Sequence, residues 1–143
     1  MFKTYGFRYT SQEDANLFKL VSIGHETTSD TSYRWNGLTR GGRGVIFQYT
    51  MKGAGKLHTG KETYIVPAGH AFLVNIPGDH EYAFDPDLAE EWEYVWIRFD
   101  GIVEDWLNKN GLGLQSPIVE ISPDSAPFRL LWQLYTDTSD KRV

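Results

Sequence analysis

The stretch WEYVWIRF, residues 92–99, alternates two sets of side chains and predicts the strand from which the fold can be built. Successive side chains of a strand point to opposite faces, and same-side neighbours lie roughly 6.6 Å apart. One face therefore carries three aromatic rings and a guanidinium, from Trp92, Tyr94, Trp96 and Arg98. This pattern fits a sheet with a recognition surface on one side and a packed core on the other. Burial of both faces between two sheets is the alternative, because aromatic residues favour strands for packing alone.

Shorter strand patterns, separated by glycine- and proline-containing turns, precede this stretch. The turns include GLTRGGRG (37–44), with four glycines in eight residues, and the breakers at 67–69 and 77–79. Gly53 and Gly55 are expected to end the strand after residue 51. The expected strands lie at 20–23, 33–35, 45–51, 62–66, 71–76 and 80–84. Short strands at about 8–12-residue spacing are typical of a β-sandwich or barrel, so the sequence predicts a mainly β protein.

The bulk composition fits one globular domain. A chain of 143 residues with 41% hydrophobic and 23% charged residues is long enough to bury a core. The absence of cysteine excludes disulfides and thiolate metal sites and agrees with a reducing compartment, so we expect a cytoplasmic protein. No apolar run approaches the ~20 residues of a membrane span, and residues 1–10 contain no apolar signal region.

The charge distribution argues against nucleic-acid binding by this segment. The net charge is −5, from 14 basic and 19 acidic residues. Domains that bind nucleic acid normally carry a basic stripe, whereas the lysines and arginines between residues 40 and 61 are scattered. We therefore do not expect this chain to bind DNA by itself.

Helical patterns replace strand patterns after the aromatic strand. Residues 100–111 predict a short helix capped by Asp100 and ended by an Asn-Gly pair. After a proline-containing linker, Ser125 is the candidate N-cap of a second helix over 125–135. Its apolar residues cover more than one stripe, so this helix is either enclosed within the fold or docked on a partner. Residues 136–143 are polar, and we expect the natural protein to continue beyond them.

Several short motifs follow one another between residues 33 and 101. They are Tyr33 with Arg40, Gly53-x-Gly55-x-Leu57, Pro67-Ala68-Gly69, Ile76-Pro77-Gly78-Asp79-His80-Glu81-Tyr82 and WEYVWIRFDG. Their order and spacing, together with the two C-terminal helices, resemble the N-terminal cupin domain of AraC-type transcriptional regulators. The resemblance covers most of residues 20–135.

This resemblance implies a specific organisation of the chain. Residues 20–100 would form a cupin-like β-barrel (jelly roll) that binds an effector, preceded by an N-terminal arm over 1–19. Residues 101–143 would form a C-terminal helical dimerisation segment with two α-helices. Regulators of this type continue into a pair of helix-turn-helix motifs, which this sequence lacks. The resemblance therefore implies a non-catalytic sensor module, a homodimer that reaches DNA only through a missing C-terminal domain and has no membrane contact.

Family roles can be carried over to individual residues. In the sugar-responsive members, a basic residue entering the first barrel strand holds ligand hydroxyls, and Arg40 occupies that place. The tyrosine after the P-G-x-H turn corresponds to Tyr82, and the stacking tryptophan to Trp96. Its polar partner is Tyr94 here, where the arabinose regulator has a histidine, and this departure argues against arabinose. The ligand-binding candidates are Arg40, Tyr82, Tyr94, Trp96, Glu26 and His80.

These residue types suit an uncharged sugar or polyol. The C–H face of a sugar stacks on a ring such as Trp96, and its hydroxyls need fixed donors and acceptors. A buried polar group left unpaired costs ~1–3 kcal/mol, so such groups discriminate against analogues that lack a hydroxyl. The structural alternative makes Tyr82 and Trp96 core rings, Arg40 a surface ion pair and Glu26 a solvated carboxylate. The dimer-interface candidates are Leu131, Trp132, Leu134 and Tyr135.

A metal-dependent cupin enzyme, such as a sugar isomerase or an oxygenase, is the main alternative. Metal-binding cupins place a His-x-His pair and a Glu before the glycine matched here by Gly53, but residues 38–52 contain no histidine and no carboxylate. His80 alone remains from their second motif, and zinc or iron needs at least three converging ligands. We expect His80 to close its turn by hydrogen bonding, and His58 and His70 to lie at the surface unless they meet across a hairpin. The expectation is therefore no catalytic residue, no metal and no cofactor. A free-standing sugar-binding module is the third possibility.

Overall fold

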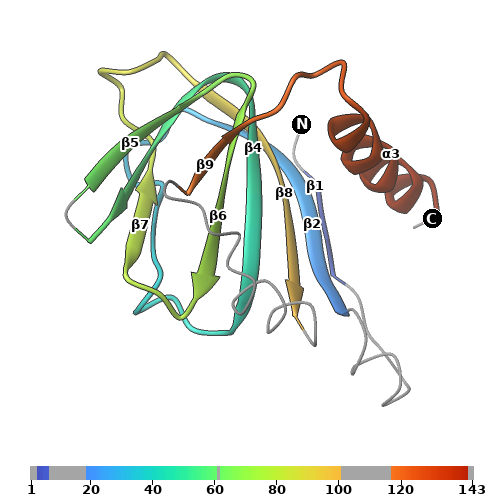
Figure 1. The fold of residues 1–143 in the computed structure, drawn as a ribbon, viewed down its shortest axis with the longest axis horizontal. Helices are drawn as coiled ribbons and strands as arrows, with labels where there is room; N and C mark the ends of the chain where they lie inside the picture. The colour runs from blue at the N-terminus through green and yellow to red at the C-terminus, as the bar shows by residue number, and fades with distance from the viewer. Residues whose placement is uncertain (1–2, 7–18, 61, 101–116, 142–143) are drawn as a thin grey trace.

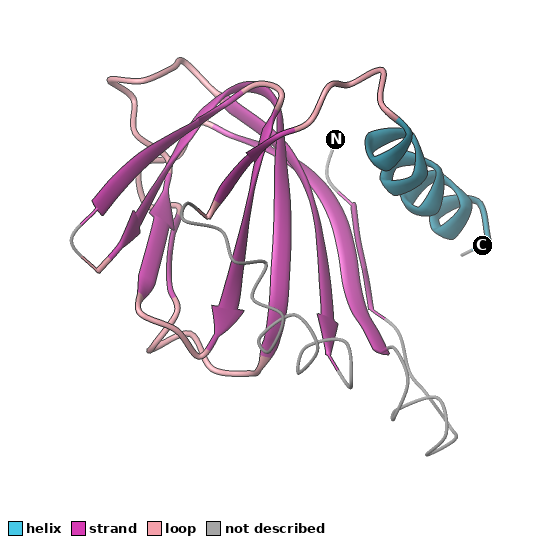
Figure 2. Cartoon of the chain, viewed as in Figure 1, coloured by secondary structure: helices cyan, strands magenta, loops and turns pink. Residues whose placement is uncertain are grey.

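The computed structural model describes residues 3–6, 19–60, 62–100 and 117–141, which form antiparallel strands followed by a helix (Figure 1). Figure 2 shows the strands gathered into one body, with the helix packed to one side. The elements are β1 (Lys3–Gly6), β2 (Lys19–Thr28), β3 (Arg34–Asn36), β4 (Gly44–Thr59), β5 (Glu62–Pro67), β6 (His70–Ile76), β7 (His80–Ala83), β8 (Trp92–Asp100), β9 (Ile118–Glu120) and α3 (Ala126–Lys141). The mainly β expectation is confirmed.

Two antiparallel sheets share strand β4. The first sheet has the order β1-β2-β8-β4-β6-β9, and the second has the order β5-β4-β7-β3. Residues 44–53 of β4 pair in the first sheet and residues 54–59 in the second. A strand that changes sheets in this way joins them at a corner, so that their inner faces oppose each other.

Gly53 lies where β4 changes sheets. Its φ is 78°, and a Cβ atom there would lie 1.8 Å from the carbonyl oxygen of Glu91. A register shift between Thr50 and Lys52 accompanies this bend. The predicted interruption after residue 51 is therefore wrong. Glycine tolerates both the left-handed conformation and the close backbone approach, so the chain bends without leaving the sheet.

Two apolar clusters lie on opposite faces of the first sheet. The inner cluster, between the sheets, contains Ile46, Leu57, Val66, Phe72, Val74, Ile76, Tyr82, Phe84, Trp92 and Tyr94. The outer cluster, between the sheet and α3, contains Ile23, Tyr49, Ala71, Val95, Leu131 and Tyr135. Strand β8 thus directs Trp92 and Tyr94 inward and Val95 toward the helix, which confirms the alternation predicted for residues 92–99.

The C-terminal elements differ from their predicted bounds. The backbone N–H of Phe128 donates to Ser125 Oγ at 3.4 Å, which confirms Ser125 as the N-cap. Helix α3 continues to Lys141 rather than ending at residue 135, because a polar sequence without a breaker does not stop a helix. Strand β9 occupies part of the expected linker and pairs with β6. The other predicted helix, at 100–111, falls almost wholly outside the described residues.

At the other end of the chain, β1 pairs with β2 at residues where the sequence shows no period. Most of the predicted arm over 1–19 lies outside the described residues. No helix in the described parts of the chain combines the length and the apolarity that crossing a membrane requires.

Candidate ligand-binding site

A cavity of about 380 Å³ lies between the inner faces of the two sheets. This volume falls in the range typical of small-molecule sites. Strands β2, β4 and β8 of the first sheet contribute to its wall, as do β3 and β7 of the second. The lining residues are Ser22, Glu26, Tyr33, Trp35, Arg40, Ile46, Gln48, Tyr82, Trp96 and Arg98.

Trp96 provides an aromatic wall of this cavity. It pairs with Gly24 across β2 and β8. A Cβ atom on Gly24 would lie 2.2 Å from Cη2 of the indole, so the ring occupies the space where a side chain would stand. Because Gly24 has no side chain, the half-buried Trp96 ring lies over the β2 backbone. The part of the ring that does not contact Gly24 lines the cavity.

Arg40 is held over aromatic rings beside the cavity. Its Nη1 donates to the Tyr82 hydroxyl at 2.5 Å, and its Cζ lies 4.3 Å from the centroid of the Trp35 ring. A guanidinium over an indole face gains a favourable cation–π interaction. Burial raises the pKa of Tyr82 although Arg40 acts to lower it, so the phenol stays protonated at neutral pH. Arg40 thus stacks on rings rather than forming the ion pair of the structural alternative.

Glu26 and Tyr94 form a partly buried hydrogen bond at one side of the cavity. The Tyr94 hydroxyl donates to Glu26 Oε2 at 2.6 Å, and Tyr94 itself is fully buried. Burial and the neighbouring Tyr33 and Glu26 raise the pKa of Tyr94 far above its usual range. Because the phenol keeps its proton, it acts as a donor that orients the Glu26 carboxylate. Tyr94 therefore acts on the cavity indirectly, by fixing the Glu26 side chain that lines it.

Arg98 also lines the cavity. The sequence predicted that it shares a strand face with Trp96 but indicated no function for it. Its Nε and Nη2 donate to the carbonyl oxygen of Arg43 at 3.2 and 2.7 Å. Gly42, with a φ of 77°, lies against the guanidinium, and a Cβ atom there would be 2.3 Å from Nη2. The glycine-rich segment 40–44 thus wraps around Arg98. Burial and the nearby positive charge of Arg40 lower the pKa of Arg98.

Gln48 is a second residue that sequence reasoning missed. Its side chain is 2% exposed and lines the cavity, and its Nε2 makes no hydrogen bond of good geometry, although the side chain interacts with the neighbouring Tyr33 hydroxyl. An unpaired buried donor costs about 1–3 kcal/mol. The signal was present in the sequence, because a glutamine interrupts the apolar residues of a central strand at an inward position. A ligand acceptor in the cavity would satisfy this amide.

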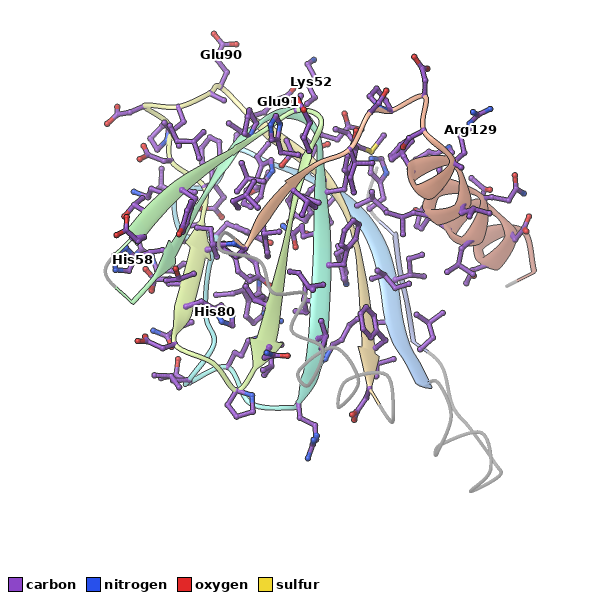
Figure 3. The ribbon with its side chains drawn as sticks, in the orientation of Figure 1. Lys52, His58, His80, Glu90, Glu91 and Arg129 are labelled. Atoms are coloured by element: carbon purple, nitrogen blue, oxygen red, sulfur yellow. The ribbon has the colours of Figure 1, made fainter. Side chains whose placement is uncertain are left out.

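The structure brings four of the six ligand-binding candidates to the cavity wall, namely Arg40, Tyr82, Trp96 and Glu26. Tyr94 lies behind Glu26. His80 does not line the cavity, and Figure 3 shows it on β7.

The environment of His80 corrects one expectation. The imidazole is 6% exposed and stacks on Tyr82 with ring centroids 6.1 Å apart, and its Nε2 has no hydrogen-bond partner. The turn is closed instead by backbone groups, because the His80 N–H donates to the carbonyl of Gly78 at 2.9 Å. Burial, assisted by the charge of Arg40, lowers the pKa of His80 to about 4.

The remaining histidines named as possible ligands lie apart from the cavity. His58 is exposed and hydrogen-bonds the Thr63 hydroxyl, and Figure 3 shows it near the tip of the β4–β5 hairpin. His70 lies near the carbonyl of Ala68. Within the described residues, no three His, Cys, Asp or Glu side chains are grouped so that they could hold a metal ion.

The four dimer-interface candidates occupy different environments on α3. Leu131 and Tyr135 are buried against the chain's own sheet, and Trp132 is partly buried beside His25. Leu134 is 36% exposed, and its neighbour Leu130 is 70% exposed. An apolar groove of about 330 Å³ runs between the helix and the outer face of the sheet. It is lined by Phe47, Leu73, Ile97, Phe99, Leu130, Leu131 and Leu134.

Comparisons with known proteins agree with a binding function. Residues 21–142 match the family model described as the AraC-like ligand binding domain. The chain is similar to the Msm operon regulatory protein of Streptococcus mutans, with 34% identity over 56 residues, covering 39% of this chain and 19% of that protein. Its fold is similar to that of the protein YhaK from Escherichia coli, with a TM-score of 0.57 and 13% identity. That match covers 88% of this chain and 57% of YhaK, so the chain spans less than two thirds of either relative.

Proposed function

Because this chain belongs to the family of AraC-like ligand-binding domains, we propose that it senses a small molecule for a bacterial AraC-type transcriptional regulator. The proposed module is non-catalytic and cytoplasmic, and it combines a cupin-like jelly-roll barrel with two C-terminal helices. It contacts DNA only through a further domain of the same regulator. The match to an operon regulatory protein that extends well beyond the aligned segment supports this arrangement.

The proposed effector is a sugar or a related polyol. The supporting observation is the position of Trp96 in a cavity of about 380 Å³ whose other walls carry hydrogen-bonding groups. An indole accepts the apolar C–H face of a pyranose or furanose ring. Glu26, fixed by Tyr94, accepts hydrogen bonds, whereas Arg40 and Gln48 donate them. The cavity therefore matches the two kinds of surface that a sugar presents.

A thermal-shift screen against a sugar library tests this proposal. A ligand that binds only the folded state raises the melting temperature by mass action. We expect at least one sugar to raise it for the wild-type protein and for Trp132→Ala, in which an indole outside the cavity is removed. The same sugar should give no shift with Trp96→Ala. An equal shift for Trp96→Ala, or no shift with any sugar, would contradict the proposal.

The dimerisation part of the proposal uses the exposed side of α3. Leu130 and Leu134 stand next to the apolar side chains Phe47, Ile97 and Phe99 of the outer sheet face. Exposed apolar surface of this kind is typical of an interaction site. Leu131 and Tyr135 would contribute indirectly, because both pack against the chain's own sheet and so hold the helix in place.

A further inference from the structure

The cavity carries more positive than negative charge. Among the described residues, two guanidinium groups, from Arg40 and Arg98, and one carboxylate, from Glu26, line it. Oxygen Oε2 of that carboxylate already accepts a hydrogen bond from the Tyr94 hydroxyl. None of the ion pairs found among the described residues includes Arg40 or Arg98. A local excess of positive charge in a chain of net charge −5 is therefore a property of this site.

Both guanidinium groups are fixed by uncharged partners. The carbonyl of Arg43 accepts from Nε and Nη2 of Arg98, which leaves Nη1 without a partner among the described residues. Arg40 is fixed by the Tyr82 hydroxyl and the Trp35 ring. Each group is thus oriented by hydrogen bonds and ring contacts with uncharged partners, although the Asp100 carboxylate also acts on the charge of Arg98. The charge of Arg40 also acts on Arg98, so the two cations are close enough to repel each other.

The unsatisfied hydrogen-bonding groups of the cavity are mainly donors. Gln48 Nε2 is buried and makes no hydrogen bond of good geometry, and Nη1 of Arg98 has no acceptor among the described residues. Two mutually repelling cations and an unpaired amide N–H₂ are all stabilised by an anion, whose oxygens accept several hydrogen bonds. A neutral sugar hydroxyl supplies an acceptor but leaves the repulsion between the guanidinium groups in place.

We propose that the effector is an anionic sugar, whose carboxylate or phosphate is bound by Arg40 and Arg98 while its ring stacks on Trp96. This inference rests on the proposed sugar-binding function and narrows it to one chemical class. It replaces the uncharged guest expected from the sequence. Glu26 would accept a hydroxyl of the same ligand, and Gln48 would donate to it.

Isothermal titration calorimetry with matched sugars tests the inference. Glucose, glucuronate and glucose 6-phosphate form one set, and galactose, galacturonate and galactose 1-phosphate form the other. We expect one anionic member of a set to bind at least about 10-fold more tightly than its neutral parent, since hydrogen bonds to charged groups are stronger. Its affinity should fall as the salt concentration rises. Comparing the uronates with the phosphates identifies which anion the site prefers.

Arg98→Gln should abolish the preference for the anionic member, because the affinity for the anion should fall at least about 10-fold more than the affinity for the neutral sugar. Arg98→Lys keeps the positive charge and should keep part of the preference. Arg129→Gln is the matched control, because Arg129 is exposed near the start of α3, away from the cavity (Figure 3). Its preference should equal that of the wild type, and melting temperatures verify that each variant is folded.

Two results would overturn the inference and leave the proposed function standing. The first is a neutral sugar that binds as tightly as its anionic partners. The second is a folded Arg98→Gln protein that retains the full preference for the anion. If neither these six compounds nor any sugar of the thermal-shift library binds to the wild-type protein, both the sugar-binding proposal and the inference fail.

Discussion

Lowering the pH from 6.5 toward 4 should destabilise this protein through protonation of His80. The imidazole is 6% exposed, and burial together with the charge of Arg40 lowers its pKa to about 4 from an ordinary 6.5. Between these two values the unfolded chain binds a proton that the folded protein excludes. The free energy of unfolding therefore rises with pH across this window and becomes flat above about pH 6.5.

The size of the effect follows from the two pKa values. Each unit of difference between the folded and unfolded pKa is worth about 1.36 kcal/mol of stability. A folded pKa of about 4 in place of 6.5 therefore lowers the free energy of unfolding by on the order of 3 kcal/mol at acidic pH. The two described carboxylates whose pKa values are lowered add little in this window. Asp30 and Asp85 have lowered pKa values in the folded protein, so their contribution is lost only as the pH falls below about 4.

Urea unfolding followed by tryptophan fluorescence, from pH 4 to pH 7.5, measures this dependence. The wild type should lose on the order of 3 kcal/mol more than His80→Gln between pH 6.5 and 4. His58→Gln, which removes an exposed histidine, should follow the wild-type curve. If His80→Gln showed the same pH dependence as the wild type, the buried neutral imidazole would not be the cause, and the reasoning would be refuted.

Three further substitutions test the binding cavity and α3. Gly24→Ala should lower sugar affinity at least about 10-fold in calorimetry, because the new Cβ would lie 2.2 Å from the Trp96 ring and displace it. Gly60→Ala is the control: its Cβ would meet nothing within 4 Å, and although its φ of 53° strains a side chain, the substitution should leave sugar affinity unchanged. Unchanged affinity in Gly24→Ala would argue against ligand contact with this ring. Leu130→Asp should weaken the dimer in sedimentation equilibrium with little effect on folding, because Leu130 is 70% exposed. Leu131→Ala should instead lower the free energy of unfolding by about 2–5 kcal/mol, because Leu131 is buried at 9% exposure. A dimer that persists in Leu130→Asp would exclude this side of α3 as the interface.

Local periodicity predicted the parts of the fold that depend on one strand at a time. The alternation of residues 92–99 identified the inward and outward faces of β8, because side chains of any strand alternate with period 2. The same reasoning failed at Gly53. A glycine that ends a strand and one that lets a strand bend have the same sequence signature. Only the pairing of β4 with both sheets separates the two cases.

The candidate site could be predicted only where a single residue carried the signal. Trp96, Arg40, Tyr82 and Glu26 were identified through the family resemblance, and all four line the cavity. The network around them depends on contacts between residues distant in sequence. Tyr94, for example, bonds Glu26 across 68 positions of the chain. Such pairings follow from the sheet topology, which no short stretch of sequence contains.

The glycine pattern of residues 40–44 correctly predicted a loop but did not indicate that this loop contacts Arg98. Its glycines predicted a loop, and residues 40–43 do lie outside the strands. In the structure, however, Gly42 is placed where a side chain would strike the Arg98 guanidinium, and the next carbonyl holds that guanidinium. The same five residues begin with Arg40, whose guanidinium also faces the cavity. One short loop thus supplies one cation and fixes the other, so glycine is required at position 42 by the site rather than by the turn alone.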